Sequence, residues 1–287
     1  MTAIYKKELR SMFTNMSGAI AIAVMLLVTG LMFRFYNLHN GVLTLHYTVS
    51  NSALVFYIVI PVLSMRSFAE ERRQKTDQLL LTAPVGLLRI VLGKYLAIVT
   101  VFAIPVLVMC IYPLIMLSFG PETLLWDYTC LLAFFFMGCA YLSVGMFISS
   151  CTESPVIAAI LTILFVFATQ MLSSIFTMIS GTALIAMLFL TALSVLISLL
   201  VYMMTGHYAL SMIVLAGLGA ACIAGYVLRP DLFSGRTESV LRILDFSTHF
   251  SDFAGGVFAI PNLMFFLSYA AVGVLLTIQS LDKRRWS

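Results

Sequence analysis

The chain has 287 residues, of which 62% are hydrophobic and only 10% are charged, and its formal net charge is +4. A water-soluble domain carries about a quarter of charged residues because its surface faces water, so this composition excludes a soluble core. The charges are also missing from long stretches, each at least as long as the roughly 20 apolar residues that cross a bilayer as a helix. Because a spanning segment must satisfy its own backbone hydrogen bonds, the sequence predicts an all-α polytopic membrane protein.

Residues 1–17 are predicted to form a helix ahead of the first span. Its apolar residues fall on one helical face and its basic and polar residues on the other: Tyr5, Leu9, Met12, Phe13 and Met16 against Lys6, Lys7, Arg10 and Thr14. A basic amphipathic helix before a span is typical of a helix that lies in the membrane interface. The alternative is that these residues are only the polar start of the first span.

The remainder, 18–287, is predicted to be a transmembrane domain of about eight helices. The expected spans are 18–34, 50–65, 90–118, 128–148, 155–179, 182–204, 208–227 and 262–280. The charge-free stretch 154–228 is too long for one or two crossings, and the pairs Ser180-Gly181 and Gly206-His207 divide it into thirds of membrane-spanning length. A total of six spans stays open if the hairpin 182–227 does not fully cross.

The distribution of Lys and Arg tests this topology, because short cytoplasmic loops are enriched in them. With eight spans and a cytoplasmic N-terminus, twelve of the 16 lie inside. The four outside are Arg34, Arg229, Arg236 and Arg242. Removing one span would move Lys283, Arg284 and Arg285 outside. We therefore expect an even number of spans in the cell membrane, with both termini on the cytoplasmic side.

The sequence offers no catalytic constellation. The predicted spans contain almost no ionisable side chains, which argues against chemistry within the membrane and against ion-coupled transport. The five cysteines form no Cys-x-x-Cys pair and the four histidines are dispersed, so no metal site is expected. Residues 86–95 come nearest to a phosphate-binding loop, but Tyr95 stands where a magnesium-binding Ser or Thr is required. We expect a chain that is not an enzyme and holds no cofactor of its own.

The predicted cytoplasmic loop 66–94 is the most informative segment. Its first part is a solvated stalk, dense in charges of both signs, and includes Arg72. Its second part, 76–84, is a short apolar turn in which Leu79 and Leu80 form a small knob. A short amphipathic helix on a charged stalk is suited to docking in a groove of a partner protein. The alternative is a solvated loop that only carries topology charges.

This loop reads Phe68-Ala-Glu-Glu-Arg-Arg, followed by Thr76-x-x-Leu-Leu-Leu-Thr-x-Pro-Val. It resembles the first cytoplasmic loop of type-2 ABC exporter permeases, where a coupling helix seats on the ATPase subunit. The family often has Gly where this chain has Lys75. The resemblance implies that the following residues contact the ATPase: Glu70, Glu71, Arg72, Arg73, Lys75, Thr76, Asp77, Leu80 and Pro84.

Three further segments resemble the same family. The run Tyr5-Lys-Lys-Glu-Leu-Arg-Ser resembles its N-terminal interfacial helix, in which Lys6, Lys7 and Arg10 would form the polar face. The run 246–256, within an extracytoplasmic segment 229–261, and the ending Leu281-Asp-Lys-Arg-Arg-Trp resemble the gliding-motility-type branch. The family core has six spans, so the hairpin 182–227 looks like an insertion.

The extracytoplasmic segment also has a periodicity of its own. Aromatic residues at helical spacing predict an amphipathic helix over 242–257 that lies on the outer leaflet. The resemblance to the exporter family implies that this segment lies near the exit of the transport path, with Phe246, His249, Phe250 and Phe253 as its exit-side residues. An ordinary surface helix is the alternative.

The resemblance implies a permease subunit of an ABC exporter that moves a hydrophobic or amphipathic cargo. ATP and Mg would be bound by a separate ATPase subunit. The other expected partners are a second permease copy or a related permease and the membrane lipids, with no nucleic acid. Two alternatives stay open: a scaffold or assembly subunit of an ATPase-driven envelope complex, and an intramembrane enzyme, for which buried polar groups are missing.

Overall fold

The structure is a computed structural model, and it describes residues 1–76, 86–119, 124–178, 208–228 and 245–286, with positions 191, 194, 195 and 198. Every regular element within these residues is helical, which confirms the all-α fold class. The chain divides into two compact units. The first comprises Met1–Phe167 and His249–Ser287, and the second comprises Ala168–Thr248.

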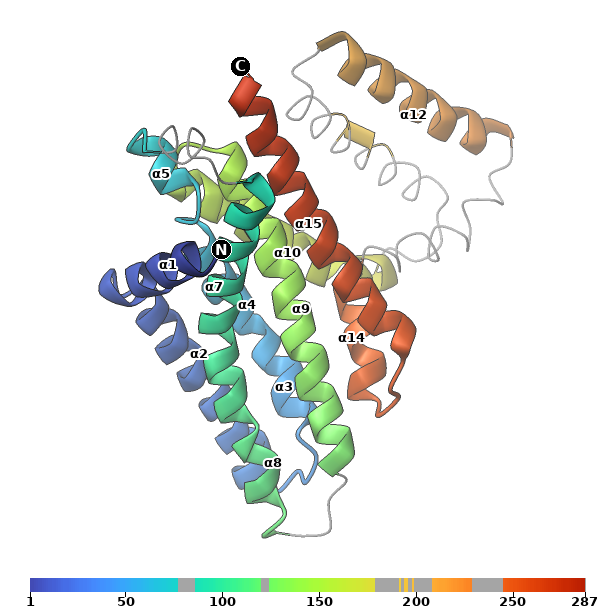
Figure 1. The fold of residues 1–287 in the computed structure, drawn as a ribbon. Helices are drawn as coiled ribbons and strands as arrows, with labels where there is room; N and C mark the ends of the chain where they lie inside the picture. Colours follow the sequence, from blue (N-terminus) through green and yellow to red (C-terminus); the bar gives the residue numbers. More distant parts are fainter. Residues whose placement is uncertain are drawn as a thin grey trace. The chain divides into compact units, whose positions relative to one another are not determined.

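The first unit holds both the N-terminal helices and the C-terminal helix (Figure 1). In chain order its elements are α1 (Thr2–Thr14), α2 (Ser17–Phe33), the π-helical segment η1 (Arg34–His39), α3 (His46–Ser52), the 3₁₀ turn η2 (Ala53–Val55), α4 (Phe56–Ser64), α5 (Ala69–Arg73), α7 (Leu87–Met109), α8 (Ile111–Met116), α9 (Leu124–Cys151) and α15 (Ile260–Trp286). Helices α10 (Pro155–Met178) and α14 (Phe246–Ala254) have residues in both units, and α12 (Tyr208–Leu228) belongs to the second.

Five helical segments are long and apolar enough to cross a membrane: Ser17–His39, His46–Arg73, Leu87–Met116, Leu124–Cys151 and Ile260–Arg285. They coincide with five of the predicted spans, and α10 and α12 coincide with two more. The chain is therefore a multi-pass membrane protein. The predicted span 182–204 lies almost wholly outside the described residues, so the choice between six and eight spans stays a prediction.

Helix α9 forms the centre of the first unit, where it packs against α4, α7 and α15. Its span is 72% buried by protein, against 28% for the span that begins with α2. Small residues let the backbones approach. A Cβ added at Gly138 would run into the ring of Phe102 on α7, and one added at Gly145 would run into Oγ of Ser64 on α4. In lipid the hydrophobic effect does not drive helices together, and small residues at the crossings allow the close van der Waals packing that does.

Helix α1 lies across α7 and does not continue the axis of α2 (Figure 1). The chain turns between α1 and α2 at Met16, whose φ of 56° is left-handed. This conformation costs a non-glycine residue roughly 1–2 kcal/mol. Gly18 then allows the tight crossing, because a Cβ there would lie 3.3 Å from both the Met12 carbonyl oxygen and a methyl group of Val101. The packing of α1 therefore holds this turn in place.

Both chain termini belong to the same end of the first unit, which we call the charged end. It is formed by α1, α5, the start of α7 and the ends of α9 and α15, and there Arg284 lies 3.6 Å from Glu153. At the opposite end, Trp126 Nε1 donates a hydrogen bond to the Ala254 carbonyl at 3.2 Å.

Candidate functional site

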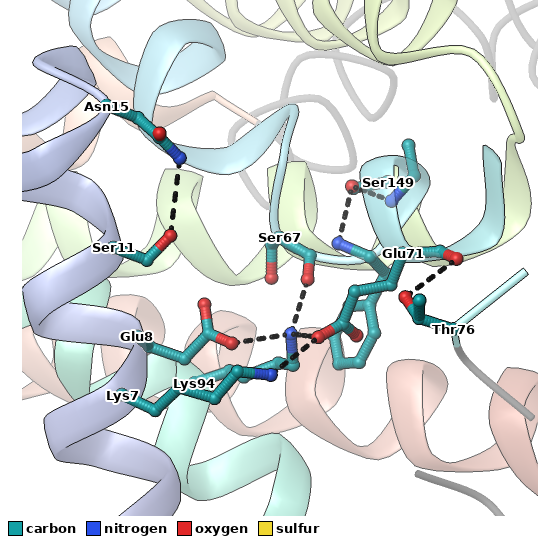
Figure 2. A network of polar contacts seen from close by, with 11 residues as sticks. Lys7, Glu8, Ser11, Asn15, Ser67, Glu71, Thr76, Lys94 and Ser149 are labelled. Carbon is teal, nitrogen blue, oxygen red and sulfur yellow. Dashed lines mark hydrogen bonds and ion pairs between the residues drawn. The ribbon is translucent and has the colours of Figure 1, made fainter. Parts of the chain in front are cut away.

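A buried ion network occupies the charged end, where α1, α5 and α7 meet (Figure 2). At its centre is Lys94 of α7, whose side chain is 1% exposed. Its Nζ donates to Glu8 Oε1 at 3.0 Å and to the carbonyl oxygen of Ser67 at 2.7 Å, and it lies 2.9 Å from Glu71 Oε1. The ring of Phe68 lies 4.8 Å from the same ammonium, within cation–π range. The network therefore joins α1, α5 and α7 through one side chain.

Burying an ammonium group is costly unless charged and hydrogen-bonding partners surround it. Here Lys94 meets two carboxylates, and the side chains of Glu8 and Glu71 are themselves only 14% and 17% exposed. Two carboxylates around one ammonium leave an excess negative charge. Lys7 offsets it from the solvent side, with its Nζ 3.7 Å from Glu71 Oε1 and its side chain 67% exposed. The result is an approximately neutral cluster that fixes α5 beside the start of α7.

Helix α5 is also fixed to the end of α9. Ser149 Oγ accepts hydrogen bonds from the backbone N–H groups of Phe68 and Ala69 at 3.2 and 3.1 Å, and it donates to the Met65 carbonyl at 2.9 Å. A hydroxyl from another helix thus caps the first turn of α5, a contribution typically worth about 1 kcal/mol. The short stalk is thereby held on two sides.

Arg72 takes part in the same anchoring. Its Nη1 donates to the Ser150 carbonyl at 2.8 Å, and its Nη2 lies 3.4 Å from Glu153 Oε1. Glu153 in turn pairs with Arg284 at 3.6 Å, so α5, α9 and α15 share a chain of contacts. The sequence predicts a solvated Arg72, and this is wrong, because its side chain is 10% exposed. The end of α9 provides carbonyl and carboxylate acceptors that sequence spacing does not reveal.

The other residues predicted to contact an ATPase are distributed between surface and interior. Arg73, Lys75 and Thr76 are exposed, and Glu70 is half-buried with Oε2 3.9 Å from Arg66 Nε. Glu71 turns inward to Lys94. The remaining predicted contacts Asp77, Leu80 and Pro84, with the expected apolar knob, lie outside the described residues. Their role stays a prediction.

Lys75 has a left-handed backbone, with φ of 57°. It follows α5 directly, and its N–H donates to the Arg72 carbonyl at 3.0 Å, while the N–H of Thr76 donates to the Glu71 carbonyl at 3.0 Å. Glycine adopts this conformation without the steric cost of a Cβ. The geometry explains why glycine suits this position and indicates that Lys75 is strained.

A second polar cluster lies at the opposite end, around Asn262 of α15. The Asn262 side chain donates to Asp252 Oδ2 at 2.7 Å and to the His249 carbonyl at 3.3 Å, while its Oδ1 lies 2.8 Å from His249 Nδ1. The ring of His249 also stacks on Phe265, with centroids 4.0 Å apart. Asn262 therefore ties α14 to the start of α15.

The aromatic side of α14 faces protein. The sequence places this side in the outer leaflet, but Phe250 is 5% exposed and Phe253 is fully buried. Phe246 is fully buried too. The helical spacing therefore groups these aromatic residues on one face of α14, but this face packs against protein and not against lipid. Trp126 contributes on the α9 side, and a Cβ at Gly256, whose φ is 82°, would run into its indole.

The sequence of the chain also has a match among known protein families. A family model described as ABC-2 family transporter protein matches residues 39–278, which is most of the chain. The chain belongs to the ABC-2 transporter family. Comparison with curated proteins gives no further match. Membership makes the chain a membrane-spanning permease subunit of an ABC transporter and implies association with an ABC ATPase. The match includes the loop 66–94 and the segment 229–261, and it begins after α1.

Membership of the ABC-2 family confirms the resemblance seen in the sequence at the level of the permease family. The sequence did not identify Lys94, Glu8 or Asn262 as organising residues of this permease. One signal was present for Lys94, because it is a charged residue inside the predicted span 90–118. Charges placed within a span are costly and therefore point to function or to a buried partner.

Proposed function

We propose that the chain is the permease of an ATP-driven exporter, and that an ATPase subunit on the cytoplasmic side engages residues 77–85. The single observation that carries this proposal is the Lys94 network. In the sequence, residues 77–85 stand between α5 and α7, and Lys94 ties these two helices to each other and to α1. Force applied to the loop is thereby passed to α1 and α7 together.

In this proposal, ATP and Mg are bound by the ATPase, and closure of that subunit pulls on the loop. The two states of the pathway respond according to how well each accommodates the closed ATPase. Arg73, Lys75 and Thr76 are exposed at the base of the loop and take part in the contact. Both termini, which share the charged end, are assigned to the cytoplasm of the cell by the excess of Lys and Arg there.

The cargo is proposed to be hydrophobic or amphipathic, for example a lipid-linked molecule or an apolar peptide. The predicted spans contain almost no ionisable side chains, and the core of the first unit includes the aromatic residues Phe56, Phe102, Phe134 and Tyr141, all fully buried. A second copy of the chain or a related permease completes the pathway. We further propose the gliding-motility-type branch, on the strength of the segments 246–256 and 281–286.

The test is co-purification of the chain with its ATPase from native membranes. Leu80→Asp places a charge on the predicted apolar knob, and central anchors of this kind cost about 2 kcal/mol or more when disrupted. The variant is expected to insert normally, because the loop is outside the bilayer, and to lose the ATPase. Leu80→Met, which keeps an apolar side chain of similar volume, is the matched control and is expected to retain it. Retention of the ATPase and of coupled hydrolysis by Leu80→Asp would show that the loop is a topology spacer.

A further inference from the structure

The outward face of α1 carries a shallow depression of about 480 Å³. Its lining residues are all from the helix and the turn that follows: Lys6, Lys7, Arg10, Ser11, Thr14 and Asn15. The opposite face of α1 is engaged with protein, since Glu8 binds Lys94 and Tyr5 donates a hydrogen bond to Thr100 at 3.1 Å. The depression is therefore presented outward by a helix whose orientation is fixed.

The charge of this depression is positive. Lys6, Lys7 and Arg10 are exposed, and the acidic residue of α1, Glu8, is paired with Lys94 and is not among the lining residues. Lys7 has a partner in Glu71 at 3.7 Å, but its side chain is still 67% exposed. Within the described part of the chain, Lys6 and Arg10 make no ion pair. Lys6 and Arg10 therefore bring uncompensated positive charge to the depression, and Lys7 adds a third basic group whose charge is partly offset by Glu71.

Neutral polar residues line the same depression: Ser11, Thr14 and Asn15. Asn15 Nδ2 donates to Ser11 Oγ at 3.3 Å, which holds the amide and the hydroxyl together at the edge of the depression. Cationic groups with neighbouring amide and hydroxyl groups form the donor set that suits a phosphate ester.

The position of the depression, at the start of the first span, indicates that the phosphate belongs to a membrane lipid. The first span starts at Ser17, directly after the turn. Apolar side chains are exposed along the next stretch of the chain, with Phe13 at 43%, Met16 at 67% and Ile20 at 53%. The exposed side chains therefore change from cationic to apolar within a few residues, as the membrane does between its phosphate layer and its acyl chains. A soluble anion or an acidic protein would leave these exposed apolar side chains uncovered.

We propose that this depression binds the headgroup of an anionic phospholipid, with Lys6, Lys7 and Arg10 around the phosphate and the acyl chains against Phe13, Met16 and Ile20. Each basic side chain near an anionic membrane surface contributes to such binding, and the contributions fall off within a Debye length. The proposal needs only the membrane location of α2, and it holds whether or not residues 77–85 contact an ATPase.

The experiment is a titration of the delipidated chain, in neutral detergent, with phosphatidylglycerol and with phosphatidylcholine, followed by native mass spectrometry. The wild-type chain is expected to retain phosphatidylglycerol in preference to phosphatidylcholine. The triple variant Lys6→Gln, Lys7→Gln, Arg10→Gln is expected to lose at least about tenfold in affinity for phosphatidylglycerol.

The matched control removes three exposed basic residues from the same end of the chain: Arg73→Gln, Lys75→Gln and Arg89→Gln. It is expected to change the affinity by less than about twofold, because these residues lie outside the depression. Circular dichroism and thermal denaturation of both triple variants show whether the fold is kept.

Inorganic phosphate and glycerophosphoglycerol, which has the headgroup without acyl chains, separate a lipid site from a simple anion site. Neither is expected to displace phosphatidylglycerol at millimolar concentration. Displacement by either one, equal retention of the two lipids, or an equal loss in both triple variants would overturn the proposal.

Discussion

Replacing Lys94 by methionine is the sharpest perturbation of the charged end. Methionine keeps an unbranched side chain of similar length and removes the ammonium group. Glu8 and Glu71 would then face each other without the cation that lies 3.0 and 2.9 Å from them. The carbonyl of Ser67 would also lose its donor at 2.7 Å.

The expected magnitude follows from the burial of the three charges. Removing one partner of a buried ion pair costs about 3–5 kcal/mol, because the other charge is left uncompensated. Lys94 is 1% exposed, but the carboxylates of Glu8 and Glu71 belong to side chains that are 14% and 17% exposed, so some water reaches them. We expect Lys94→Met to destabilise the protein by about 3 kcal/mol, the lower end of that range.

The assay is unfolding of the purified protein in dodecyl maltoside, by titration with sodium dodecyl sulfate and by thermal denaturation. Lys75→Met is the matched control, since its side chain is exposed, and it is expected to stay within about 0.5 kcal/mol of the wild type. Adding Glu71→Gln to Lys94→Met removes the surplus carboxylate and is expected to recover at least about 1 kcal/mol. Unchanged stability of Lys94→Met, or no coupling between the two substitutions, would refute the reasoning.

Three further changes probe separate parts of the first unit and of the stalk. Gly138→Ala drives a methyl group into the ring of Phe102 and is expected to cost about 1–3 kcal/mol in unfolding titrations, whereas Gly217→Ala, with nothing within 4 Å, serves as the tolerated control. Lys75→Gly relieves the left-handed backbone and is expected to raise the melting temperature, corresponding to about 1 kcal/mol; a loss of stability would contradict the strain. Asn262→Ala removes two donated hydrogen bonds to α14 and is expected to speed hydrogen exchange over 249–254, while exchange at α1 stays as in the wild type; unchanged exchange in α14 would count against the role of Asn262.

The positions of the spans could be predicted because a bilayer imposes a minimum length on each apolar stretch. The span predicted at 128–148 falls within α9, and the one at 155–179 matches α10. The ends were less accurate. The segment Leu87–Met116 has 30 residues, which is about 45 Å of helix. This exceeds the roughly 30 Å of hydrocarbon, so an untilted segment of this length extends beyond it.

The Lys94 network could not be predicted from charge counts. Such counts assign a residue to one side of the membrane and say nothing of where its side chain points. Glu8 and Glu71 are distant from Lys94 in the sequence, and only the crossing of α1 over α7 brings all three together. The same crossing explains how a lysine within a predicted span is accommodated.

The aromatic face of α14 illustrates a second limit. Periodicity shows that Phe250 and Phe253 share a helical face. An apolar face can pack against lipid or against a protein core, and periodicity does not distinguish the two. Asn262 is a lone polar residue at the start of a span, and its contacts with His249 and Asp252 depend on a turn that returns α14 to α15. Neither feature has a signature in local sequence.

The measurement that bears most directly on the proposed function is site-specific photocrosslinking in native membranes. Benzoylphenylalanine at position 80 lies in the loop proposed to engage the ATPase, and the same residue at position 43, in the connection between η1 and α3 at the opposite end, is the control. The expected result is an adduct between position 80 and a nucleotide-hydrolysing subunit, with none from position 43. An adduct of that subunit with position 43, or no adduct from position 80 while the subunit is present in the same membranes, would contradict a permease driven through this loop.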